Sequence, residues 1–221
     1  MYPYGSRPGS VYGLAKVHKT DVPLTPVISL LHTPQYGLAK YLDGIIKPCI
    51  PNRYMLESSS DFINKLSCVN FPARYSMVSF DVVSLFTNVP LDEVIELACT
   101  YVYSDASMSK PKYDVNHFSK LLQMATSGEF LYRDGLYRQV DGVAMGSPLA
   151  PTLANLFLAH LEQDWLKTKC APITYFRYVD DVFCLFDSSS QNHEIFLDFL
   201  NKQHTNIRFT CEVGPSSLPF S

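Results

Sequence analysis

The sequence lacks the marks of several common protein classes. Its six cysteines are scattered, and none has the paired spacing of a zinc site or a thioredoxin-type motif, so we expect reduced thiols. The N-terminus carries no basic and apolar leader, and no run of about 18 apolar residues could cross a membrane. We therefore expect a soluble intracellular protein with no membrane partner.

Charged residues are also scarce in this sequence. Only 18% of the residues are charged and the net charge is −3, which argues against a large phosphate-binding surface. Residues 1–60 differ, because they hold six Lys or Arg residues against three Asp or Glu residues. No glycine-rich loop with its lysine is present to cradle phosphates. Metal ions and scattered basic side chains would have to bind them instead.

What is present is enough apolar sequence for one globular domain, since 47% of the 221 residues are hydrophobic. Helical periodicity and capping residues predict helices over 34 to about 47, 61–66, 91 to about 103, from a cap at Asn116 to about 122, from Ser147-Pro148 to about 167, and 193–203. Short runs of apolar, β-branched and aromatic residues predict strands over 24–31, 75–80, 130–133, 136–139, 175–179, 182–186 and 207–213. This order predicts a mixed α+β fold with an antiparallel sheet flanked by helices.

Two of the predicted hairpins differ in their turn residues. Asp134-Gly135 is typical of a tight primed turn, because Gly accepts positive φ values. Asp180-Asp181 separates the other two strands, which predicts that both carboxylates lie at the tip of the hairpin. The strand over 75–80 delivers Asp81 at its end, so a shared sheet would bring all three carboxylates to one edge.

Three clustered carboxylates with no Lys or Arg beside them would repel one another strongly. Divalent metal binding is the usual way to relieve this repulsion, and two Mg²⁺ ions are the expected occupants, with Mn²⁺ as an alternative. Two such ions activate an attacking hydroxyl and stabilise a leaving pyrophosphate in phosphoryl transfer. A polar turn at Asp180-Asp181 with no catalytic role is the plainer alternative.

Three blocks resemble the reverse transcriptases. Tyr178-Val-Asp-Asp181 looks like their Y-x-D-D box, and Ser79–Phe86 resembles the motif that supplies their first aspartate. Gly142–Pro151, leading into Asn155, resembles the loop and helix that contact template and nucleotide, and it stands in the correct order between the other two. Tyr12–Lys19 and Asn88–Pro90 make the chain similar to Penelope-like retroelements in particular, over about residues 7–220.

The resemblance implies a right-hand polymerase palm with partial fingers. It implies a partial fingers region over 1–70 and a palm over 71–221, with the N-terminal fingers and the thumb truncated. The implied function is that of an RNA-directed DNA polymerase, a nucleotidyltransferase of a retrotransposable element. Its partners would be an RNA template, a DNA primer and deoxynucleoside triphosphates, and a nuclear location would follow from the family.

The resemblance also implies roles for single residues. Asp81 and Asp180 would bind both metal ions, Asp181 would assist, and the backbone carbonyl of Val82 would be a further ligand. Phe86 would be the aromatic gate that excludes a ribose 2′-hydroxyl. The remaining implied contacts are with nucleotide, through Gly146, Ser147 and Pro148, and with nucleic acid, through Lys16, Lys19 and Tyr178.

One departure and several plainer interpretations stay open. The family usually has Leu-Arg-Pro where this chain has Leu24-Thr25-Pro26, so an arginine near the triphosphate is missing and Lys16 and Lys19 would replace it only as point charges. An inactive, truncated remnant that folds and binds nucleic acid is therefore the alternative function. A carboxylate-based hydrolase is disfavoured by the Y-x-D-D order. Phe86 could be core, the Gly146–Pro148 segment an ordinary helix start, and the lysines part of a solvated loop.

Overall fold

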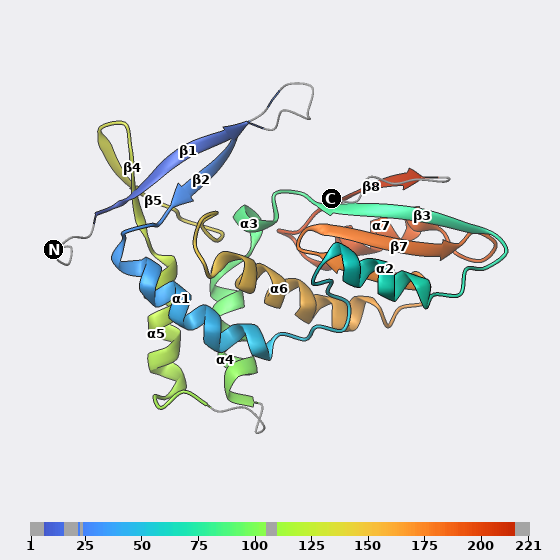
Figure 1. Cartoon of the computed structure of the whole chain (residues 1–221), viewed down its shortest axis with the longest axis horizontal. Coiled ribbons are helices and arrows are strands. Elements are labelled where there is room, and N and C mark those ends of the chain that lie inside the picture. The colour runs from blue at the N-terminus through green and yellow to red at the C-terminus, as the bar shows by residue number, and fades with distance from the viewer. Residues whose placement is uncertain (1–6, 16–21, 23, 105–109, 215–221) are drawn as a thin grey trace. The chain divides into compact units, whose positions relative to one another are not determined.

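A computed structural model describes residues 7–15, 22, 24–104 and 110–214 of the chain (Figure 1). The chain forms two compact units, each built from two separate stretches of sequence. The first unit comprises residues 1–50 and 86–156, and the second comprises residues 51–85 and 157–221. These boundaries differ from the predicted division into a fingers region (1–70) and a palm (71–221), which concerns function and stays a prediction.

The first unit contains a four-stranded sheet in the order β2-β1-β4-β5. Its strands are β1 (Gly9–Ala15), β2 (Leu24–Ser29), β4 (Glu129–Tyr132) and β5 (Gly135–Arg138). β1 runs antiparallel to β2 and parallel to β4. The sequence analysis missed β1, because its two glycines weaken the apolar alternation on which a strand prediction depends.

Helices complete the first unit. They are α1 (Pro34–Ile46), the 3₁₀ turn η1 (Lys47–Cys49), α4 (Leu91–Ser104) and α5 (Val115–Thr126). The three α-helices each bury a stripe with helical spacing, for example Ala39, Leu42 and Ile46 in α1, and Phe118, Leu122 and Ala125 in α5. A four-residue helix, α3 (Leu85–Asn88), precedes α4 and was not predicted.

The second unit is a four-stranded antiparallel sheet in the order β6-β7-β3-β8. Its strands are β6 (Thr174–Tyr178), β7 (Asp181–Asp187), β3 (Tyr75–Val82) and β8 (Phe209–Gly214), and its helices are α2 (Ser59–Ser67) and α7 (His193–Gln203). The chain passes from the first unit to the second within α6 (Ala150–Trp165), whose buried residues include Leu153, Phe157 and Trp165.

The two faces of this second sheet are covered by different helices (Figure 1). On one face Phe80 packs edge-on against Phe196 of α7, with ring centroids 5.8 Å apart. On the other face Phe183 packs against Phe62 of α2 at 5.2 Å. Aromatic residues therefore face the covering helix on each side of the sheet.

The α+β class with antiparallel pairing and flanking helices is confirmed, although several details were wrong. The described residues form two sheets, of which the second is the predicted antiparallel sheet flanked by helices. Asp114, and not Asn116, caps α5, because its carboxylate accepts a hydrogen bond from the His117 N–H. The left-handed turn residue of the β4–β5 hairpin is Arg133 (φ +53°), so the turn lies one residue before the predicted Asp134-Gly135. No helix in the described ranges is long and apolar enough to cross a bilayer.

Candidate active site

Asp81 lies near the end of β3, which has β7 on one side and β8 on the other. Side chains alternate along β3, so that Val78, Phe80 and Val82 are buried on one face and Asp81 lies on the other, where it is exposed. The registers of the two ladders place Asp81 directly opposite Asp181 of β7 on one side and Thr210 of β8 on the other.

This register brings together two carboxylates that are 100 residues apart in the sequence. Residues that are directly opposite in an antiparallel pair project from the same face, with Cβ atoms about 4.5–5.5 Å apart. Asp81 and Asp181 therefore belong to the same face and the same end of the sheet. Like charges in this arrangement destabilise a sheet unless something compensates them.

Asp180 lies in the turn between β6 and β7. Because Tyr178 pairs with Asp181, the turn consists of Val179 and Asp180, and Asp181 is the first residue of β7 rather than part of the tip as predicted. Val179 has a φ of +54°, which is unusual for a β-branched residue. The Val82 N–H donates a hydrogen bond to the Asp180 carbonyl at 3.2 Å, which fixes the turn to the end of β3.

The donor chemistry of these residues suits a hard divalent cation. Carboxylate oxygens are the ligands that Mg²⁺ prefers, and the strand register supplies two of them on one face beside a third in the turn. Within the described part of the chain, no group of three or more His, Cys, Asp or Glu side chains is arranged so that it could hold a metal ion. The residues therefore fit such an ion by type and by strand position, and not as a closed cage.

The Gly142–Pro148 loop of the first unit is bound at two points to other parts of that unit. Val143 N–H donates to the Phe86 carbonyl at 2.7 Å, and Ile28 N–H donates to the Met145 carbonyl at 2.8 Å. Gly142 (φ +73°) and Gly146 (φ +110°) adopt conformations that L side chains rarely adopt. A Cβ at Gly142 would lie 2.6 Å from the Thr87 carbonyl oxygen, and a Cβ at Gly146 would collide with the Ile28 carbonyl.

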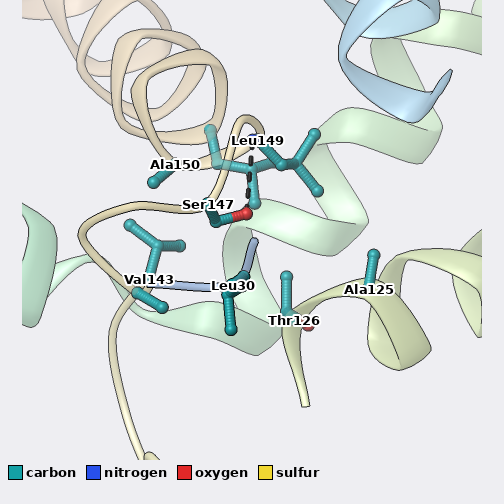
Figure 2. Close-up of a pocket in the computed structure, with 9 residues that line it drawn as sticks. Leu30, Ala125, Thr126, Val143, Ser147, Leu149 and Ala150 are labelled. Atoms are coloured by element: carbon teal, nitrogen blue, oxygen red, sulfur yellow. Dashed lines mark hydrogen bonds between the residues drawn. The ribbon is translucent and has the colours of Figure 1, made fainter. Parts of the chain in front are cut away.

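Ser147 turns its hydroxyl toward its own loop (Figure 2). Its oxygen accepts a hydrogen bond from Leu149 N–H at 3.3 Å, and its side chain lines a cavity of about 10 Å³ together with Leu30, Thr126 and Val143. α6 begins at Ala150, two residues after the predicted first helical position at Pro148. Pro148 is half-buried and Gly146 is exposed, so the loop keeps an accessible backbone.

Comparison with known proteins identifies the family. A family model described as "Reverse transcriptase (RNA-dependent DNA polymerase)" matches residues 17–212, which is most of the chain. The chain belongs to the reverse transcriptase family. No match was found among curated proteins.

Solved polymerase structures share the fold of this reverse transcriptase chain. Telomerase from Candida albicans, in complex with a TWJ fragment of telomeric RNA, matches 96% of the chain with a TM-score of 0.67 and 11% identity. Telomerase from Candida tropicalis gives a TM-score of 0.66 and 10% identity over 98% of the chain. The RNA-dependent RNA polymerase of BmCPV gives 0.54 and 13% over 94%. These similarities show a polymerase palm fold.

The chain spans less than half the length of these relatives. It covers 43% of the Candida albicans telomerase chain, 42% of the Candida tropicalis chain and 20% of the viral polymerase. Activities and ligands of the whole proteins therefore do not transfer directly to this reverse transcriptase.

The remaining predicted site residues of the reverse transcriptase are spread over both units. Phe86 is half-buried in α3, and Thr25 is half-buried in β2 opposite Leu14. Tyr178, at the end of β6, is 41% exposed. Lys16 and Lys19 lie outside the described residues.

Sequence reasoning missed a buried polar cluster beside the Asp180 turn. Arg177 in β6 and Glu162 in α6 are each only 1% exposed, and Tyr175 is 6% exposed. Arg177 Nη1 donates to the Val179 carbonyl at 3.0 Å, so the expectation that no Lys or Arg lies beside the carboxylate cluster was wrong. An arginine inside an otherwise apolar strand was the available signal, because such a residue is buried only when it is paired.

Proposed function

We propose that this chain is the catalytic palm, with part of the fingers, of an RNA-directed DNA polymerase from a retrotransposable element of the Penelope-like kind. Its reaction would be the addition of deoxynucleotides to a DNA primer 3′-end on an RNA template. The observation that carries the proposal is the register that sets Asp81 opposite Asp181, with Asp180 in the adjoining turn. A family match over residues 17–212 supports the same reading.

Each site residue has a distinct role in this proposal. Asp81 and Asp180 would hold two Mg²⁺ ions, with Asp181 assisting and the Val82 carbonyl as a further ligand. When bound, such ions activate the primer hydroxyl and stabilise the charge of the leaving pyrophosphate. Binding would require the carboxylates to rotate toward a common point, which exposed side chains do readily.

Residues of the first unit would receive the nucleotide and the template. The accessible backbone at Gly146 and the neighbouring Ser147 and Pro148 would contact the incoming nucleotide. Phe86 would pack against its sugar and exclude a 2′-hydroxyl. The loop's hydrogen bond to the Phe86 carbonyl would hold these two elements in one arrangement. Lys16, Lys19 and Tyr178 would contact nucleic acid.

Primer extension tests the proposal. Purified protein is given an RNA template, a DNA primer, deoxynucleotides and Mg²⁺ or Mn²⁺. We expect extension by the unmodified chain and a loss of at least about 100-fold in Asp180→Ala and Asp81→Asn, because each substitution removes charge that acts directly on the reacting groups. Asp198→Asn is the matched control, since Asp198 is an exposed carboxylate in α7 that pairs with Lys202.

The outcome is read against that control. Loss of extension in both site variants, with the rate of Asp198→Asn unchanged, supports the assignment. Equal extension by the unmodified chain and Asp180→Ala would remove Asp180 from catalysis.

A second candidate function is nucleic-acid binding without catalysis. Thr25 favours it, because Thr cannot supply the bidentate grip on a phosphate that an arginine provides. A chain that binds primer–template but shows no extension with either metal would favour this remnant function over the polymerase.

A further inference from the structure

The Arg177 side chain is positively charged and is buried in the second unit. Burial acts to lower the pKa of Arg177, but Glu162, Tyr175 and Asp180 together more than offset burial, and the pKa lies above its ordinary value. A buried guanidinium is tolerated only when its donors are satisfied. In the described part of the chain no buried side-chain nitrogen or oxygen lacks a hydrogen-bond partner.

Glu162 fixes the orientation of the guanidinium from α6. One carboxylate oxygen accepts from Arg177 Nε and from the Tyr175 hydroxyl, the latter at 2.8 Å. The other oxygen accepts from Arg177 Nη2 at 3.3 Å. This two-point pairing leaves the guanidinium little rotational freedom, and the geometry is one that a lysine cannot reproduce.

The remaining guanidinium nitrogen, Nη1, reaches the turn formed by Val179 and Asp180. Arg177 Nη1 donates to the carbonyl of Val179, the residue whose φ is +54°. A β-branched residue in this conformation is strained, and strain of this kind persists only where surrounding contacts hold it. The bond from Arg177 is such a contact, and it acts on the residue that directly precedes Asp180.

The backbone of Arg177 is held as firmly as its side chain. Its N–H donates to the Tyr54 carbonyl, and its carbonyl accepts from Leu56 N–H, both at 2.8 Å. On the far side of the turn, Val82 N–H donates to the Asp180 carbonyl. The turn is thus fixed between a buried ion pair and the end of β3.

We propose that Arg177, oriented by Glu162, is a positioning residue that holds the left-handed Val179 turn and so sets Asp180 and Asp181 against Asp81. Its catalytic consequence rests on the proposed polymerase function. Its structural consequence does not, because the state of the turn can be measured without any reaction.

Hydrogen exchange measures the turn directly. In Arg177→Lys the charge stays but the two-point grip on Glu162 is lost. We expect the Val82 amide, which bonds to the Asp180 carbonyl, to exchange roughly tenfold faster, while amides at the centre of β3 keep their protection. Unchanged exchange at Val82 would overturn the proposal, whether or not the protein polymerises.

Kinetics provide the second readout. Misplacing reacting groups by about 1 Å can cost about 100-fold in rate. We expect kcat for primer extension to fall between about 10- and 100-fold in Arg177→Lys, with KM for the nucleotide changed less than about threefold. A merely structural role would lower the fraction of folded protein and leave kcat per folded molecule unchanged, and that result would contradict the proposal.

Two further variants distinguish loss of the turn contact from general misfolding. Replacing the cluster by apolar residues (Glu162→Leu, Arg177→Met, Tyr175→Phe) removes the ion pair without stranding a charge, and such exchanges often preserve stability. This variant should stay folded, yet show fast Val82 exchange. Val179→Asn, added to Arg177→Lys, should slow that exchange again, because Asn tolerates positive φ. Protected Val82 in the apolar variant, or no rescue by Asn, would contradict the proposal.

Discussion

At the residue scale, the site depends on a few positions whose backbone conformation few residues accept. Val179 and Gly146 both have positive φ, and each adjoins a predicted functional residue. Gly146 has no alternative, because any Cβ would collide with the Ile28 backbone of β2. Val179 is the opposite case, since a disfavoured residue is held there by a neighbouring hydrogen bond.

Gly146→Ala should therefore damage both stability and function. The added methyl group must break the contact between the loop and β2, and we expect a loss of roughly 1–3 kcal/mol in the free energy of unfolding. Urea denaturation measures this change. Gly37→Ala is the control, because Gly37 lies exposed in α1 with no atom within 4 Å of its would-be Cβ. It should gain about 0.5–1 kcal/mol; equal effects at both positions would contradict the steric explanation.

At the scale of elements, hydrophobic periodicity was a good guide to where helices and strands lie and a poor guide to where they begin. Seven of the eight strands in the described residues were predicted, since each is a short run of apolar, β-branched or aromatic residues bounded by turn residues. The start of α5 was misjudged because Asp114 and Asn116 are both good caps. Backbone geometry chose between them, and only the structure shows it.

Asp114→Ala should destabilise the protein, whereas Asn116→Ala should not. We expect the melting temperature to fall by roughly 2–4 °C in the first variant and to change little in the second. The His117 N–H and ring lower the pKa of Asp114 below its ordinary value of 3.8. The cap's contribution is thus complete above that value and is lost as the pH falls through the lower folded-state pKa. The melting temperatures of Asp114→Ala and of the unmodified chain should therefore converge as the pH is lowered. A difference that stays constant with pH would exclude an ionised cap.

At the scale of the whole molecule, the central fact is that β3 pairs with β7, about 100 residues further along the chain, and with β8, about 130 residues further along. Each unit is built from two separate stretches of sequence, so the boundaries of the units could not be predicted from the sequence alone. The opposed carboxylates at the end of β3 lower stability when no cation compensates them. Metal binding should consequently appear in the stability of the entire fold.

Thermal melting should reveal this linkage. With Mn²⁺ at about ten times its dissociation constant, we expect the melting temperature of the unmodified chain to rise by roughly 3–6 °C. Asp81→Asn should melt roughly 1–3 °C higher than the unmodified chain in EDTA, because one of two opposed charges is gone, and it should respond little to Mn²⁺. Asp198→Asn should respond like the unmodified chain. An equal Mn²⁺ response in Asp81→Asn would argue against a site at this position.

The sequence by itself determined the α+β class, the order of most elements and the blocks that resemble a reverse transcriptase, because periodicity, turn residues and short motifs are local properties. The tertiary structure alone decided which residues meet. The register of β3 against β7 set Asp81 opposite Asp181, and the packing of α6 on β6 buried Glu162 with Arg177 beside the turn. The first pairing joins residues 100 apart and the second joins a helix to the strand that follows it, and no local pattern specifies either of them.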